Sequence, residues 1–129
     1  MNKTCLTMVF LLCQKGQCNV KNGHYRINGQ RDHLADAPFI LLLRFVQGCL
    51  IVKDRWVFAK QLVEEKITTT EGLYQAIARL KKELRWDDFL ENDRKRYRIA
   101  LNVTGITVNR KKLLENENGR VKAIARKLP

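Results

Sequence analysis

The chain has 129 residues, a length typical of a single domain that buries its own core. Its apolar content is ordinary, and it has neither a low-complexity segment nor a repeat of solenoid length, which excludes a disordered chain and a repeat array. The formal net charge is +12, from 25 Lys and Arg against 13 Asp and Glu, and such an excess favours a polyanionic partner.

The positive charge is concentrated towards the C-terminus. Residues 94–129 carry a net charge of +9, whereas residues 1–93 carry +3. A basic end of this kind suits nucleic acid, because each phosphate contact releases counterions. Two alternatives are a solvated tail and an acidic membrane surface. The basic segments lack the large aromatic face that a membrane-surface helix uses, so no membrane partner is predicted.

The four cysteines do not have the spacing of a zinc site, and no histidine lies near enough in sequence to complete a ligand set. We expect free thiols in a reducing cytosol, with no metal and no cofactor. The apolar run Cys5–Cys13 is too short to cross a bilayer, and no cleavage site for a signal peptide follows it. The sequence therefore predicts a buried strand there and a cytoplasmic protein.

Residues 1–35 are predicted to form a small antiparallel sheet. Two Asn-Gly pairs, Asn22-Gly23 and Asn28-Gly29, give the strongest short-range signal for a hairpin turn. The segments between and beside them are predicted to be strands: Leu6–Leu12, Cys18–Lys21, His24–Ile27 and Gln30–Leu34.

Residues 36–84 are predicted to form three helices. In the first, Asp36 is expected to cap and Pro38 to occupy the first turn. The segment Phe39–Gln47 is apolar nearly all round, so this helix should be the most buried, with Gly48 ending it and an extended link over Leu50–Val52.

The second helix is predicted over Arg55–Glu65, capped by Asp54. Its inner stripe is Trp56, Ala59, Leu62 and Val63.

The third helix is predicted over Thr68–Leu84, with Thr68 and Glu71 in the form of a capping box and Gly72 in its first turn. The apolar residues recur at helical spacing and form one stripe: Leu73, Ala76, Ile77, Leu80 and Leu84. The opposite side is expected to face solvent, and it carries Glu71, Gln75, Ala78, Arg79 and Lys82. Such a helix is either an ordinary surface helix or one that enters a DNA groove.

The segment RWDDFLEND after Leu84 is predicted to be an acidic loop held to the core by Trp86 and Phe89. Residues 95–109 change to a period of two and predict a β-hairpin with its turn at Thr104-Gly105. In its first strand, one face is predicted to carry Tyr97, Ile99, Leu101 and Val103, and the other Arg98, Ala100 and Asn102. Basic residues flank this hairpin: Arg94, Lys95, Arg96, Arg98, Arg110, Lys111 and Lys112. Residues 113–129 are predicted to be a basic tail or a short helix, in which the segment NENG breaks any helix and one face carries Val121, Ile124, Ala125 and Leu128.

An antiparallel sheet, three helices and a C-terminal hairpin form an α+β domain over residues 1–112. Two helices joined by a short connection and followed by a β-hairpin are the order of a winged helix-turn-helix, in which the second of the pair lies in the major groove and the hairpin touches the backbone or the minor groove.

Three segments carry a resemblance to a family. INGQRDHLADAPFILLLRFV is similar to the strand, turn and first helix of OmpR/PhoB-type DNA-binding domains. IARLKKEL, residues 77–84, resembles the recognition helix of that family, and NVTGITVN, residues 102–109, resembles its wing. The resemblance covers about two thirds of the chain and implies a winged helix-turn-helix that binds DNA and regulates transcription, here without a receiver domain.

The chain departs from the family pattern at several positions. Glu71 stands where the family has an outward Arg, Ala76 where it has His, and Thr104 where it has the wing Arg. The second wing Gly and its Tyr are Thr107 and Val108. Arg79 is the DNA-facing side chain that is cleanly kept, so the resemblance implies a different sequence specificity, and loss of DNA binding stays open.

Two functions are therefore weighed. The first is a transcriptional regulator, bacterial or phage-encoded and associated with the nucleoid, that binds double-stranded DNA as a monomer or a homodimer. Its expected contacts are side chains of the third helix and the hairpin: Glu71, Gln75, Arg79, Lys82, Arg96, Arg98, Thr104, Arg110, Lys111 and Lys112. The second is a winged-helix module that binds another protein, which Glu71 and Thr104 favour.

An RNA-acting enzyme or toxin is a third alternative. It is disfavoured because no histidine pair or histidine–carboxylate pair is placed for general acid–base chemistry. No phosphate loop, nucleophile elbow or small-molecule site is evident either, so the chain is not predicted to be an enzyme.

Overall fold

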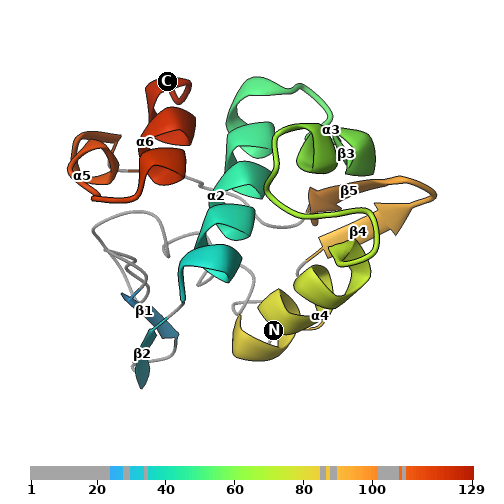
Figure 1. Cartoon of the computed structure of the whole chain (residues 1–129), viewed down its shortest axis with the longest axis horizontal. Helices are drawn as coiled ribbons and strands as arrows, with labels where there is room; N and C mark the ends of the chain where they lie inside the picture. Colours follow the sequence, from blue (N-terminus) through green and yellow to red (C-terminus); the bar gives the residue numbers. More distant parts are fainter. Residues whose placement is uncertain are drawn as a thin grey trace.

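A computed structural model of the chain describes residues 24–27, 30–33, 35–84, 87, 90–101, 108 and 110–129. These residues form a mixed α+β structure (Figure 1). The elements, in chain order, are β1 (His24–Ile27), β2 (Gln30–His33), α2 (Asp36–Ile51), β3 (Val57–Phe58), α3 (Ala59–Glu64), α4 (Leu73–Leu84), β4 (Leu90–Asp93), β5 (Arg96–Ile99), α5 (Arg110–Leu114) and α6 (Gly119–Arg126).

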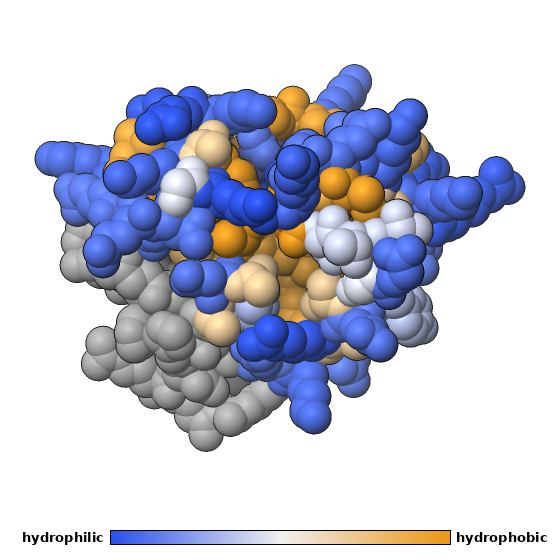
Figure 2. All heavy atoms as spheres, in the orientation of Figure 1, coloured by the Kyte–Doolittle hydropathy of each residue, from blue (hydrophilic) through white to orange (hydrophobic). Residues whose placement is uncertain are grey.

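Helix α2 is the centre of the core, as its apolar sequence predicted. Every residue from Pro38 to Gly48 is buried. In Figure 1, α5 and α6 lie on one side of α2, and α3, α4 and the strands β3, β4 and β5 lie on the other. On the face shown in Figure 2, hydrophilic residues form most of the surface and apolar atoms show near the middle.

Helix α2 does not end at Gly48, and the predicted extended link over Leu50–Val52 is wrong at its first two positions. The helix continues to Ile51, and the Val52 N–H donates to the Gly48 carbonyl at 3.0 Å. A Cβ at Gly48 would lie 2.6 Å from Val57 Cγ2, so this glycine permits a close approach of β3 rather than a helix stop. The predicted cap at Asp36 is also wrong: Ala35 is the N-cap, and no side chain caps the helix.

The second predicted helix is shorter than expected. Asp54 accepts a hydrogen bond from the Trp56 N–H at 3.2 Å within a local turn, and residues 57–58 then form strand β3. Helix α3 begins at Ala59, where the Gln61 side chain accepts from the Phe58 N–H at 2.8 Å. The predicted cap at Asp54 is therefore wrong, because this aspartate oxygen forms a local Asx turn and Phe58 is the N-cap of α3.

Helix α4 begins at Leu73, five residues after the predicted start. The Thr69 hydroxyl, not that of Thr68, accepts from the Gly72 N–H at 2.9 Å, so the predicted capping box of Thr68 and Glu71 is wrong. The predicted inner stripe is confirmed: its three central and C-terminal members Ile77, Leu80 and Leu84 are buried, and the other two pack against the core.

Strands β3, β4 and β5 form an antiparallel sheet in the order β3-β5-β4. The hairpin is β4–β5 over residues 90–99, with Arg94-Lys95 as its turn, so the predicted hairpin over 95–109 begins too late. The last four residues of the segment predicted to be an acidic loop, 90–93, form its first strand, in which Glu91 and Asp93 lie opposite Arg98 and Arg96. Trp86 and Phe89, which were predicted to hold that loop to the core, lie outside the described residues.

The predicted alternation holds only to Ile99. Tyr97 and Ile99 are buried as expected, but Ala100 is buried as well, whereas Leu101 is 50% exposed. The strand therefore ends before the position at which Leu101 would share the buried face. The predicted turn at Thr104-Gly105 lies outside the described residues.

Helices α5 and α6 pack against each other, and α6 packs against α2. The predicted apolar face is confirmed, since Val121, Ile124, Ala125 and Leu128 are all buried. The predicted helix break at NENG is confirmed too: α5 ends at Leu114, and the Asn118 side chain caps α6 by accepting from the Arg120 N–H at 2.8 Å.

Strands β1 and β2 form a hairpin whose register pairs Ile27 with Gln30, as the Asn28-Gly29 signal predicted. The same register places His24 opposite His33, a pairing that sequence spacing did not indicate. The other strands predicted for this sheet, over 6–12 and 18–21, lie outside the described residues. Within the described part of the chain, no helix has the length and apolarity needed to span a membrane.

Candidate nucleic-acid interface

The outer face of α4 is exposed along its length, as predicted. Gln75, Ala78, Arg79 and Lys82 are exposed, and so is Glu71 in the turn before the helix. Arg79 forms an ion pair with Glu83, with Nε 2.7 Å from Oε2, one turn along the helix. An exposed pair at this spacing contributes about 0.3–0.5 kcal/mol, so Arg79 can be redirected to another anion at small cost.

Tyr74 is a large hydrophobic side chain on this helix that is nonetheless exposed, at 77% of its full area. It lies between the turn that carries Glu71 and the predicted contact Gln75. The sequence analysis did not include it, because its position falls outside the apolar stripe and it carries no charge. An outward aromatic residue between polar positions is the signal that could have identified it.

The turn of the β4–β5 hairpin carries two cations. Arg94 and Lys95 are exposed, and neither forms an ion pair or side-chain hydrogen bond with another residue in the described ranges. The Ala59 N–H donates to the Lys95 carbonyl at 2.8 Å, which holds the turn against the start of α3. Arg94 has φ of 61°, a left-handed conformation that costs a non-glycine residue about 1 kcal/mol.

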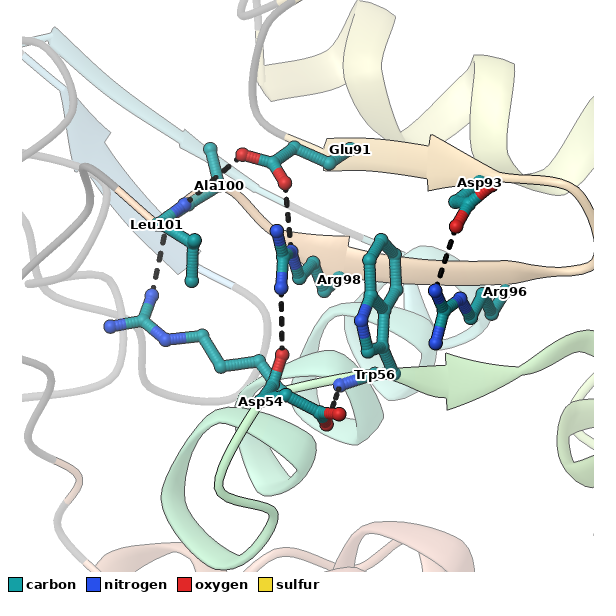
Figure 3. A network of polar contacts seen from close by, with 9 residues as sticks. Asp54, Trp56, Glu91, Asp93, Arg96, Arg98, Ala100 and Leu101 are labelled. Carbon is teal, nitrogen blue, oxygen red and sulfur yellow. Dashed lines mark hydrogen bonds and ion pairs between the residues drawn. The ribbon is translucent and has the colours of Figure 1, made fainter.

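Arg96 and Arg98 are already occupied by partners within the sheet (Figure 3). Their guanidinium groups lie over the Trp56 ring, with Cζ 4.2 Å and 4.1 Å from the ring centroid respectively. Arg96 also pairs with Asp93 and Arg98 with Glu91, each at 2.7 Å. Each of these guanidinium groups is therefore held by the Trp56 ring as well as by a carboxylate, and these contacts stiffen the hairpin.

The same network ties the hairpin to the loop after α2. Arg98 donates from Nη1 to the Asp54 carbonyl at 3.1 Å, and Arg55 donates to the Ala100 carbonyl at 3.1 Å. The hydrogen bond from Arg98 is the main reason why the pKa of Glu91 is lowered from its usual value. The Leu101 N–H and the nearby arginine charges act in the same direction, and desolvation opposes them.

The basic residues after the hairpin have different surroundings. Arg110 donates from Nε to the Ala125 carbonyl at 3.0 Å and from Nη2 to the Arg126 carbonyl at 3.3 Å, so it satisfies the C-terminal end of α6. Lys111 is exposed on α5. Lys112 lies in the same helix, and its side chain, like Thr104, is outside what the structure describes.

The structure brings the start of α4 and the hairpin turn together. Thr70 and Leu73 line one pocket with Arg94 and Lys95, so the start of α4 lies beside the two cations of the turn. The exposed residues of α4, of the turn before it and of the hairpin turn are defined here together as the α4–turn surface: Glu71, Tyr74, Gln75, Ala78, Arg79, Lys82, Arg94 and Lys95. Arg110 and Lys111 lie on α5, which packs on the other side of α2.

Metal chemistry finds no support in the described ranges, where no three His, Cys, Asp or Glu residues gather as a ligand set. Cys49 is half-buried, and burial raises the pKa of its thiol to about 11. A thiol with a raised pKa is a poor nucleophile and a poor metal ligand at neutral pH.

Comparison with known proteins gives no relative: no family model, curated protein or solved structure matches the chain.

Proposed function

We propose that this chain is a DNA-binding transcriptional regulator with a winged-helix fold, acting in the cytoplasm. In this proposal α4 enters the major groove, and the β4–β5 turn lies on the neighbouring phosphates. The observation that carries the proposal is the order α2, β3, α3, α4, β4, β5, with β3 paired beside β5. A helix, a strand, two helices and a hairpin whose second arm pairs with that strand is the arrangement of winged-helix domains.

The α4–turn surface supports the same proposal. Arg79 and Gln75 are suited to base edges in the major groove, and Lys82 to a phosphate beside it. The sequence predicted Arg96, Arg98 and Thr104 as the DNA contacts of the wing. We now propose Arg94 and Lys95 instead, because they are the exposed cations at the hairpin turn.

Fewer segments of the chain now support the proposed resemblance to OmpR/PhoB-type domains. It covers the segments that form α2 and α4, while the wing moves to residues 90–99. The similarity of residues 102–109 to the family wing carries no part of the proposal.

Binding to random duplex DNA over a salt series tests the proposal. We expect the logarithm of the binding constant to fall linearly with the logarithm of salt concentration. Lys82→Ala should reduce that slope by about one unit, and Arg79→Ala should also weaken binding to the random duplex. The matched control is the double variant Lys53→Ala with Arg126→Ala, which removes one lysine and one arginine exposed outside the α4–turn surface. Equal losses in the control and in the α4 variants would contradict the proposal.

A second candidate is a module that binds another protein through the same helix. It is favoured by Tyr74, which is 77% exposed, and by the acidic Glu71 beside it. Aromatic residues are enriched at the centre of protein interfaces, and a carboxylate at this position repels phosphate. Absence of salt-dependent DNA binding, together with retention of folding, would favour this candidate.

A further inference from the structure

A groove of about 520 Å³ lies between α3, the start of α4 and the β4–β5 hairpin. We propose that it binds a small organic anion with an apolar body, such as a medium-chain or aromatic carboxylate. The groove is lined by Ala59, Lys60, Val63, Glu64, Thr70, Leu73, Arg94, Lys95 and Tyr97. The sequence indicated no small-molecule ligand, because these residues come from three separate segments of the chain.

The lining has two chemical parts. Ala59, Val63, Leu73 and Tyr97 provide apolar surface, and three of these four are only partly buried, so the surface is accessible. A pocket of this volume with mostly apolar walls and a few polar groups is typical of sites for small molecules. A ligand with an apolar body would remove this surface from water.

The charge of the lining favours an anion. Lys60, Arg94 and Lys95 are cationic, against the one carboxylate of Glu64. Glu64 already has a partner, since its Oε2 is 3.8 Å from Lys60 Nζ. Arg94 and Lys95 have no such partner among the described residues, so they are available to a carboxylate.

The walls of the groove are held in place by contacts within the protein. The hydrogen bond from the Ala59 N–H to the Lys95 carbonyl holds the hairpin turn to α3. Tyr97, behind the turn, is buried and packs against Phe45 of α2, with ring centroids 6.4 Å apart. A preformed site of this kind spends little binding free energy on ordering.

Because of where the groove lies, a bound ligand would regulate DNA binding. This regulatory effect rests on the proposed function. Arg94 and Lys95 line the groove and also belong to the α4–turn surface. A carboxylate bound to them would compete with DNA phosphates, and the two affinities would be coupled reciprocally. The anion would therefore weaken DNA binding.

The test uses the full chain with anilinonaphthalene sulfonate, a fluorescent anion with an apolar body, as the probe. We expect fluorescence enhancement that saturates, displacement by octanoate, and no displacement by octylammonium, which has the opposite charge. Val63→Glu, which adds a carboxylate inside the groove, should lower probe affinity by at least about tenfold. Ala37→Glu adds the same group at an exposed position in the first turn of α2, outside both the groove and the α4–turn surface, and should leave probe binding unchanged.

Equal probe binding by Val63→Glu and the wild type would overturn the inference, and so would equal displacement by octylammonium. Circular dichroism of Val63→Glu establishes whether it is folded, and Lys95→Glu, at an exposed turn, provides a second variant with the same expected loss. The probe titration needs no DNA. Failure of the groove is therefore distinguishable from failure of DNA binding, which Arg79→Ala and Lys82→Ala report.

Discussion

Gly48 lies where α2 passes closest to β3. Gly48 follows the apolar helical segment and precedes a predicted extended link, which suggested that it ends the helix. Its backbone is instead helical, and its missing side chain makes room for Val57. Sequence alone could not separate these two uses of glycine, because the neighbour that needs the space is nine residues away and on another element.

We predict that Gly48→Ala destabilises the protein by about 1–3 kcal/mol, because the new Cβ would lie 2.6 Å from Val57 Cγ2 and 3.2 Å from the Arg55 carbonyl oxygen. Urea denaturation measures the change. Gly119→Ala is the matched control: nothing lies within 4 Å of its Cβ, so stability should stay within about 1 kcal/mol of the wild type or rise. Similar losses in both variants would show that Gly48 has no special packing role.

Glu91 provides a prediction about pH. Its pKa is lowered in the folded state, chiefly by the hydrogen bond from Arg98. A carboxyl group of this kind stabilises the fold above its unfolded-state pKa and loses that contribution as pH falls through the folded-state pKa.

We therefore expect the melting temperature of Glu91→Gln to fall less than that of the wild type between about pH 6 and about pH 3. Thermal melts followed by circular dichroism give the comparison. Glu115→Gln, at an exposed position directly after α5, should follow the wild-type curve. Parallel curves for Glu91→Gln and the wild type would mean that the Arg98 contact adds nothing to stability.

At the scale of the element, the ends of the helices were harder to predict than their buried faces. The stripe of α4 follows from the 3.6-residue period, which any helix must obey. Its start depends on which of three consecutive threonines accepts from Gly72, and Thr69 rather than Thr68 does so. Competing local hydrogen bonds differ by little in free energy, so the surrounding structure selects among them.

The end of α3 has a C-capping motif that the sequence does not indicate, because no glycine stands at the position with positive φ. Lys66 has φ of 60°, the Ile67 N–H donates to the Leu62 carbonyl at 3.0 Å, and the Lys66 N–H donates to the Val63 carbonyl at 3.0 Å. This is a Schellman motif with lysine where glycine is usual.

We predict that Lys66→Gly stabilises the protein by about 1 kcal/mol, because glycine adopts this conformation without steric cost. The free energy of unfolding in urea is the measurement. Lys53→Gly, at an exposed position without a positive φ, should instead be neutral or destabilising. A loss of stability in Lys66→Gly would contradict the assignment of strain to this residue.

At the scale of the whole molecule, the C-terminal segment belongs to the same core as the rest of the described chain. Val121 and Ala125 are fully buried, and α6 packs against α2. Arg120 donates to the Lys66 carbonyl, which ties α6 to the end of α3 as well. The sequence left a basic tail and a short helix as alternatives, because an amphipathic stripe does not say what it packs against.

We predict that Ile124→Ala lowers the free energy of unfolding by about 2–4 kcal/mol while the transition stays single, because a buried side chain of the shared core is lost. Urea denaturation followed by two probes, tryptophan fluorescence and circular dichroism, measures this. Arg126→Ala, exposed on the same helix, should change stability by less than about 0.5 kcal/mol. An unchanged midpoint for Ile124→Ala would mean that α6 is not part of the cooperative unit.

The sequence by itself determined the mixed α+β class, the burial of α2 and the inner faces of α4 and α6. These follow from hydrophobic periodicity, which is a local property of the chain. It also predicted the outward position of Gln75, Arg79 and Lys82, because the buried stripe leaves no other side for them.

Only the tertiary structure decided which arginines are available and which segments form the hairpin. Arg96 and Arg98 look like free cations in the sequence, yet Trp56, some forty residues earlier, lies between them, and the acidic residues 91 and 93 pair with them across the hairpin. These contacts join residues that are distant along the chain, and periodicity carries no information about such pairs. The groove at the hairpin turn could not be predicted from the sequence for the same reason, since Arg94 and Lys95 line it together with residues of α3 and the start of α4.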